Sequence, residues 1–370
     1  MSWWVVIQHL LQASGLSNEH SPPVVKLLSM GGLAVMVFAI ISGFVITHLV
    51  LTKREPYLPY VIRRFFRIYP LYLVAIMLAL ALRSGYEAVI VDAPWADPSS
   101  ALRFDVQQPY LWLHTVLHLL LVHGLVPDMA LQSASMSILG PAWSLSLEWQ
   151  FYLVAPGIVA VVLMRGHPVV QLVCFTGMAA VMSVTYAIAD QFEYPAALPL
   201  CIGFFLIGVV TRCWLGGTSL PRLLPALAVA VLNLILYIQA YGYGRAWMGA
   251  LPIAIWGVMV WYLHKSHRGQ TPNLLHRVVH LLLASRPAVT MGRWSYASYL
   301  LHLPLFVLAL WLGKAAGLPQ NETTYFLILI AACPTLVVVS GLAYRWIEQP
   351  GMSLGKFIVR IDRASGRNKT

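Results

Sequence analysis

The chain has 370 residues, of which 59% are hydrophobic and only 10% are charged. Soluble domains carry about 25% charged residues, so this composition excludes a soluble globular protein and indicates an integral membrane protein. The formal net charge of +11 is read as a mark of cytoplasmic loops rather than of nucleic-acid binding, because Lys and Arg gather in such loops.

The chain opens with a short apolar segment, residues 3–13, which falls short of the about 20 residues that a membrane-spanning helix needs. We expect either a tilted, partial helix here or a true start upstream of Met1. The longer apolar runs that follow are unbroken rather than alternating, which predicts helices and not a barrel. They cover residues 30–51, 68–84, 143–163, 169–189, 195–212, 223–241, 246–263, 292–313 and 324–346. Another run, 111–126, is interrupted by three histidines and is expected to be re-entrant or partly buried.

Basic segments set the predicted topology. Residues 52–67, 265–293 and 345–369 are rich in Lys and Arg and are expected in the cytoplasm. This arrangement predicts an all-α, polytopic bundle of about ten transmembrane helices plus one re-entrant or partial helix, with both termini cytoplasmic. Residues 1–350 are expected to form one membrane domain, and residues 351–370 a short basic cytoplasmic tail.

Two ionisable residues lie inside apolar runs and are the first candidates for chemistry. His9 sits in WWVVIQHLLQ, where it is either a hydrogen-bonded structural residue or a general base that takes a hydroxyl proton. Glu148 sits in PAWSLSLEWQFYLVAP, and a carboxylate in hydrocarbon costs about 2.5–3.5 kcal/mol on the insertion scale. It either fixes helix packing or serves the reaction, by orienting a histidine or by holding substrate hydroxyls.

Further polar clusters occur at helical spacing. Arg63, Arg64 and Arg67 are three and four residues apart, which predicts a shared helix face able to bind phosphates, as in a nucleotide or coenzyme A; anchoring of the topology is the simpler reading. Tyr299 and His302 belong to a polar stripe that either joins helices or lines a cavity.

Metal binding is not expected. His114 and His118 have the spacing of two metal ligands on a helix, but no carboxylate completes the set nearby. The four cysteines show no CxxC spacing, so they indicate neither a zinc site nor a disulfide framework.

Four stretches together resemble the membrane acyltransferase-3 family of acyl-CoA-dependent enzymes that modify extracytoplasmic sugars. They are GGLAVMVFAIISGFVIT (31–47), YVIRRFFRIYPLYL (60–73), GPAWSLSLEWQFYLVAP (140–156) and WSYASYLLHLPLF (294–306), and the ending RWIEQPG adds to them. Two features depart from the family pattern. An arginine usual eleven residues before the first-helix histidine would precede Met1, and Met36 stands where an acidic residue is common.

The resemblance implies roles for single residues. His9 matches the catalytic base, and the Arg-rich motif at residues 63–67 matches the part that handles acyl-CoA. The signature around Ser146 and Glu148 and the YLLH motif ending at His302 match further site positions. The expected site therefore has His9 and Glu148 as catalytic residues, and its acceptor-binding residues are Trp143, Ser146, Tyr299 and His302.

The resulting expectation is an O-acyltransferase of the bacterial cytoplasmic (inner) membrane. It would move an acetyl group from cytoplasmic acetyl-CoA to a hydroxyl of an extracytoplasmic or lipid-linked surface polysaccharide, such as exopolysaccharide or lipopolysaccharide, with His9 as general base. Its partners would be the acyl-CoA, the saccharide acceptor and the bilayer, without a metal or nucleic acid. Two alternatives stay open: a transporter or flippase for a lipid-linked sugar, which would not need His9, and a non-catalytic family member, suggested by Met36 and the missing upstream arginine.

Overall fold

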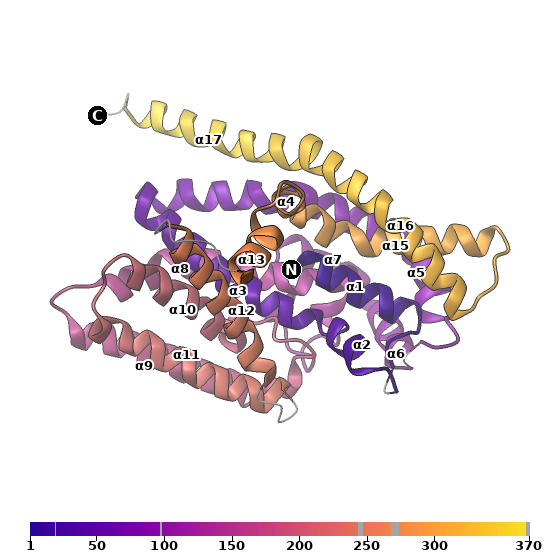
Figure 1. Cartoon of the computed structure of the whole chain (residues 1–370), viewed down its shortest axis with the longest axis horizontal. Helices are drawn as coiled ribbons and strands as arrows, with labels where there is room; N and C mark the ends of the chain where they lie inside the picture. The colour runs from indigo at the N-terminus through magenta and orange to yellow at the C-terminus, as the bar shows by residue number, and fades with distance from the viewer. Residues whose placement is uncertain (19, 97, 243–246, 268–273, 368–370) are drawn as a thin grey trace. The chain divides into compact units, whose positions relative to one another are not determined.

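The computed structural model describes residues 1–18, 20–96, 98–242, 247–267 and 274–367. Within these ranges the chain forms helices and turns without a strand, which confirms the all-α class (Figure 1). The α-helices are α1 Ser2–Ala13, α2 Pro23–Leu28, α3 Gly31–Lys53, α4 Tyr57–Ala81, α5 Arg83–Tyr86, α6 Pro98–Gln107, α7 Leu111–Leu119, α8 Trp143–Leu163, α9 Pro168–Tyr186, α10 Leu198–Leu215, α11 Leu220–Tyr241, α12 Trp247–His267, α13 Leu274–Ala284, α14 Arg286–Arg293, α15 Ser295–Ala315, α16 Glu322–Ala343 and α17 Gln349–Arg367.

Among the described residues, nine helices are long and apolar enough to cross a membrane, and they fall on the nine long runs of the sequence. The segment expected as the first crossing forms the helix α1. Its 12 residues are about 18 Å long, which is shorter than the hydrocarbon core of about 30 Å. The histidine-interrupted run yields only the nine-residue helix α7, which is the partial helix that was predicted. The last candidate span continues through a π-helical turn, Tyr344–Glu348, into α17.

The chain divides into two compact units, each assembled from separate parts of the sequence. Unit 1 comprises Met1–Val37, Ala81–Ala96 and Ala250–Gln349, and unit 2 comprises Phe38–Leu80, Asp97–Gly249 and Pro350–Thr370.

In unit 1, α1 packs against α15 and α16. Side chains that donate to backbone carbonyls fasten the surrounding segments. The Trp4 indole donates to the Leu27 carbonyl over 3.1 Å and ties α2 to α1, while the Trp95 indole donates to the Ala13 carbonyl over 3.1 Å at the end of α1. The bond from Trp95 gives a partner to a carbonyl at the end of α1, where a helix leaves its last carbonyls unpaired, whereas the Leu27 carbonyl also accepts from the Met30 N–H over 3.1 Å. The two indole bonds help to hold α1 in place although it is only three turns long.

In unit 2, α3 and α10 cross at two glycines. A Cβ atom on Gly43 would lie 2.1 Å from the Phe205 carbonyl oxygen, and one on Gly208 would lie 2.1 Å from the Ile40 carbonyl oxygen. No larger residue fits at either position without moving a backbone. Close approach at small residues is a common way for membrane helices to gain packing energy, since lipid provides no hydrophobic drive for association.

A buried amide joins α10 to α11. The Asn233 side chain accepts from the Gly203 backbone N–H over 3.0 Å and donates to the Pro199 carbonyl over 2.9 Å. These are the two groups that would otherwise pair with each other in the helical ladder, because they are four residues apart. Asn233 therefore sits inside the first turn of α10, and both backbone groups stay satisfied.

Candidate functional site

His9 and His302 come together in unit 1, where α1 packs on α15. Their ring centroids are 5.1 Å apart and the rings are tilted by 34°. His302 is fully buried and His9 half-buried. Two residues nearly 300 positions apart in the sequence, both singled out from local motifs, thus share one place in the fold.

The helix geometry settles which nitrogen of His302 carries the proton. Its Nδ1 lies 3.2 Å from the Ser298 carbonyl oxygen, which can only accept, so Nδ1 is the N–H donor. In the neutral ring Nε2 then holds a lone pair. Among the residues that the structure describes, this buried Nε2 has no hydrogen-bond partner. A buried polar atom left in this way calls for an explanation, and a bound ligand is one.

Aromatic side chains of α15 surround His302. The Tyr299 ring centroid lies 6.2 Å and the Phe306 ring centroid 6.1 Å from the His302 ring, the latter in an edge-on arrangement. Ser298, which supplies the carbonyl for His302, also donates its hydroxyl to Ser340 over 3.0 Å and so links α15 to α16. The orientation of His302 is thereby built into the packing of two helices.

Glu148 belongs to unit 2, on α8, and is only 7% exposed. Its Oε1 atom accepts a hydrogen bond from the Tyr152 hydroxyl one turn later and lies 3.5 Å from the Ser42 hydroxyl of α3. The positive charges of Arg67 and Arg64 also act on this carboxylate. Hydroxyl donors and nearby cations offset part of the cost of burying this carboxylate.

The three arginines of α4 take different directions. Arg63 forms an ion pair with Glu55, and the Arg64 guanidinium lies over the Tyr152 ring, 5.8 Å from its centroid. Arg67 approaches α17, where its Nη1 atom is 3.3 Å from the Met352 sulfur. The charges of Arg64 and Arg67 therefore both act on the Glu148–Tyr152 pair, and Arg67 also reaches α17, whereas Arg63 is paired with Glu55.

Ser146 and Trp143 lie in the packed first half of α8. The Ser146 hydroxyl donates to the Leu121 carbonyl over 2.8 Å and accepts from the Gly124 backbone N–H over 3.2 Å. The Trp143 ring packs against Tyr194 with centroids 5.5 Å apart. Both side chains hold loops against α8, and contact with an acceptor stays a prediction for them.

The histidines of the α7 region form a buried network in unit 2. His118 and His123 stack with centroids 3.8 Å apart, and His118 bridges the Tyr72 hydroxyl (3.1 Å) and the Ser137 hydroxyl (3.1 Å) through its two ring nitrogens. His123 donates from Nε2 to the Ala142 carbonyl over 3.1 Å. Within the described ranges, no three His, Cys, Asp or Glu side chains are arranged to hold a metal ion.

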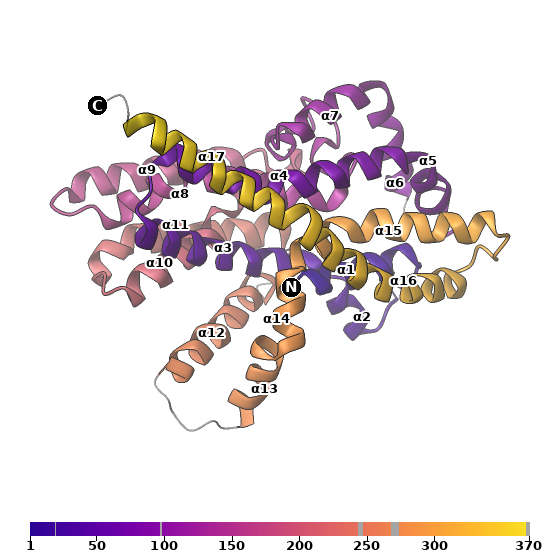
Figure 2. The ribbon, with the colours of Figure 1, turned by 90° about the horizontal axis from the view of Figure 1, so that it is seen from above.

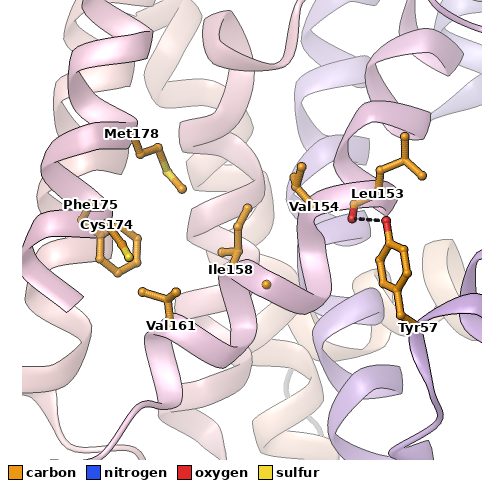
Figure 3. Close-up of a pocket in the computed structure, with 9 residues that line it drawn as sticks. Tyr57, Leu153, Val154, Ile158, Val161, Cys174, Phe175 and Met178 are labelled. Carbon is orange, nitrogen blue, oxygen red and sulfur yellow. Dashed lines mark hydrogen bonds between the residues drawn. The ribbon is translucent and has the colours of Figure 1, made fainter. Parts of the chain in front are cut away.

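An open cavity of about 530 Å³ lies in unit 2 between α8 and α9 (Figure 3). Its walls are largely apolar, and the Tyr57 hydroxyl at its edge already donates to the Leu153 carbonyl over 2.9 Å. None of the predicted site residues lines it. A reaction that needs a proton acceptor finds no suitable group in this cavity.

Two partners of the site were not foreseen from the sequence. Tyr152 stands four residues after Glu148, a spacing that places it on the same helix face, so this signal was present. Ser42 comes from a different helix and only the tertiary packing reveals it. The predicted pairing of Glu148 with His9 joins residues of different units and stays a prediction.

Comparison with known proteins agrees with the resemblance noted in the sequence. The family described as "Acyltransferase domain" matches residues 2–345. The chain is also 26% identical over 369 residues to "Acyltransferase MdmB" of Streptomyces mycarofaciens, with 94% of this chain and 87% of that protein covered. No solved structure matches significantly. Since the family match takes in nearly the whole chain, including both histidines and the arginine motif, the chain belongs to the acyltransferase-3 family of membrane acyltransferases.

Proposed function

We propose that the protein transfers an acetyl group from acetyl-CoA on the cytoplasmic side to a hydroxyl of an extracytoplasmic or lipid-linked surface polysaccharide. The observation that carries the proposal is the His9–His302 pair, in which an unpartnered, buried Nε2 lone pair lies beside a second imidazole. One neutral imidazole can accept the proton of the reacting hydroxyl, and the other can accept a hydrogen bond from a neighbouring hydroxyl of the acceptor.

In the proposed reaction His9 takes the proton of the acceptor hydroxyl, and the oxygen attacks the thioester carbonyl carbon. A C–O bond forms, the C–S bond breaks, and the leaving thiolate of coenzyme A receives the proton from His9. The Nε2 atom of His302 accepts a hydrogen bond from a second hydroxyl of the acceptor and so orients the acceptor. Proton transfer by a positioned side chain contributes about 10²–10⁴-fold to such a rate.

The supporting charges are those of unit 2. Arg64, Tyr152 and Glu148 form a connected chain of contacts, and Glu148 extends it to Ser42. We propose that Glu148 keeps its negative charge by means of these partners and serves the reaction, either by orienting His9 or by holding acceptor hydroxyls. The basic start of α4 and α17 would face the cytoplasm, in the inner membrane of a bacterium, with both termini on that side.

The test is a labelling assay in membranes from cells that express the chain. Radiolabelled acetyl-CoA is supplied, and label is followed into the polysaccharide and lipid-linked fractions. We expect label with the wild type, a loss of about 100-fold or more with His9→Ala, and unchanged label with His264→Ala, a matched exposed histidine on α12. Label that persists in His9→Ala would contradict the assignment of the base, and sugar export without any labelling would favour the transporter alternative.

A further inference from the structure

The first turns of α17 pack closely on α4 in unit 2 (Figures 1 and 2). A Cβ atom on Gly351 would lie 2.7 Å from Pro70, and one on Gly355 would lie 2.8 Å from the Phe66 Cβ atom. The contact partners on α4 decrease in residue number as those on α17 increase, so the two helices run antiparallel. The Gly-x-x-x-Gly spacing explains the close approach, because it removes two side chains from one helix face.

The register of this pair places two more cations near the arginine motif. Arg67 contacts Met352 through Nη1 and sulfur at 3.3 Å, which fixes the side of the interface on which both lie. One turn further along each helix, Arg63 lies opposite Lys356, and Arg360 follows one turn later on α17. Arg63, Arg67, Lys356 and Arg360 therefore line one edge of the α4–α17 pair, here named the cationic edge.

The cationic edge combines two arginines that have acidic neighbours with two cations whose side chains are exposed. Glu55 forms an ion pair with Arg63, while the side chains of Lys356 and Arg360 are exposed. The arginines of the cationic edge share α4 with Arg64. The Arg64 guanidinium lies over the Tyr152 ring, and the Tyr152 hydroxyl donates to Glu148. A dense group of guanidinium and ammonium donors of this kind suits a ligand with several phosphate charges.

We propose that Lys356 and Arg360 of α17 complete a binding site for the phosphates of coenzyme A, with the 3′-phosphate as a principal contact. This inference rests on the proposed function, since it names where the nucleotide end of the acyl donor binds. The same chemistry would also suit the headgroups of anionic lipids, so the experiment separates these two sources.

The test measures binding of coenzyme A and of 3′-dephospho-coenzyme A by calorimetry. It uses the full-length protein in nanodiscs of zwitterionic lipid, so that it does not depend on turnover. We expect the double variant Lys356→Ala/Arg360→Ala to bind coenzyme A about 5- to 20-fold more weakly, and to lose most of the preference for the 3′-phosphate. The matched control is Arg277→Ala/Arg286→Ala, which removes two exposed cations from α13 and α14 and should leave both affinities unchanged.

Several results would overturn the inference. These are an unchanged affinity in the α17 variant, an equal loss in the control variant, or no binding of coenzyme A by the wild type. A second set of nanodiscs contains anionic lipid. If the wild type but not the variant binds this lipid, and both bind coenzyme A equally well, the edge is assigned to lipid headgroups instead. Binding that depends on Lys356 and Arg360 without any acetyl transfer would support the inference and contradict only the proposed function.

Discussion

Replacing Tyr152 by Phe removes a single hydroxyl from the buried environment of Glu148. The ring that Arg64 covers is kept, and so is the packing of α8, so the change tests one hydrogen bond. The other hydroxyl beside the carboxylate is that of Ser42 at 3.5 Å, which is at the outer limit of a hydrogen bond. The carboxylate is 7% exposed, so water replaces the lost donor poorly.

The magnitude follows from the charge on the acceptor. A hydrogen bond to a charged group contributes about 1.5–3 kcal/mol, against about 0.5–1.5 kcal/mol for a neutral pair. Tyr152→Phe should therefore reduce the free energy of unfolding by about 1.5–3 kcal/mol in the native background, and by about 1 kcal/mol in a Glu148→Gln background. The coupling energy from this double-mutant cycle is then about 0.5–2 kcal/mol.

The assay is equilibrium unfolding of the purified protein in mixed micelles for the wild type, the two single variants and the double variant. A Tyr152→Phe cost below about 0.5 kcal/mol, or equal costs in both backgrounds, would refute the reasoning that Glu148 is held as a charged group by its neighbours.

Three other predictions concern packing, a buried amide and pH. Gly43→Ala should destabilise unit 2 by about 1–3 kcal/mol in the same unfolding assay, because its Cβ atom would meet the Phe205 carbonyl. The control Gly177→Ala, whose Cβ atom would have no atom within 4 Å, should be neutral or slightly stabilising. Similar effects at both sites would contradict the crossing geometry of α3 and α10. Asn233→Leu should cost about 2–5 kcal/mol through two lost hydrogen bonds and a clash in α10, and a cost below 1 kcal/mol would show that the amide is dispensable. Burial raises the pKa of the Asp128 carboxyl, against the opposing hydrogen bond from the Ser133 N–H. Because the pKa of Asp128 is higher in the folded than in the unfolded state, protonation favours the folded state. The stability of the wild type relative to Asp128→Asn should therefore rise as the pH falls from 7 toward 4. A stability difference that stays constant with pH would contradict this.

The membrane spans could be predicted because their signal is local. Long apolar runs and basic loops indicate helices one at a time, and each expected long run is a helix in the structure. The run containing His114 and His118 was recognised as partial for a similar reason, since polar residues interrupt it. Residue type and motif alone predicted His9, His302 and the arginines of α4 as site residues.

What the sequence did not reveal depends on contacts between distant segments. No local pattern shows that His302 would lie beside His9, or that its Nδ1 proton would go to the Ser298 carbonyl. Spacing predicts a shared face for the arginines of α4, but it does not show that Arg64 lies over the Tyr152 ring or that Arg67 reaches Met352 of α17. The basic tail was expected to be a short cytoplasmic segment. That Gly351 and Gly355 allow α17 to approach Pro70 and Phe66 of α4 is seen only in the folded structure.

The most direct test of the central claim, that His9 and His302 act as one reaction centre, is the rate of acetyl transfer in His9→Ala, His302→Ala and the double variant. Expression and thermal unfolding serve as checks that each variant folds. Groups that act as a unit are strongly non-additive, so each single variant should lose about 100-fold or more and the double variant little beyond that. Single variants that retain nearly full rates, or losses that multiply in the double variant as for independent residues, would contradict the account.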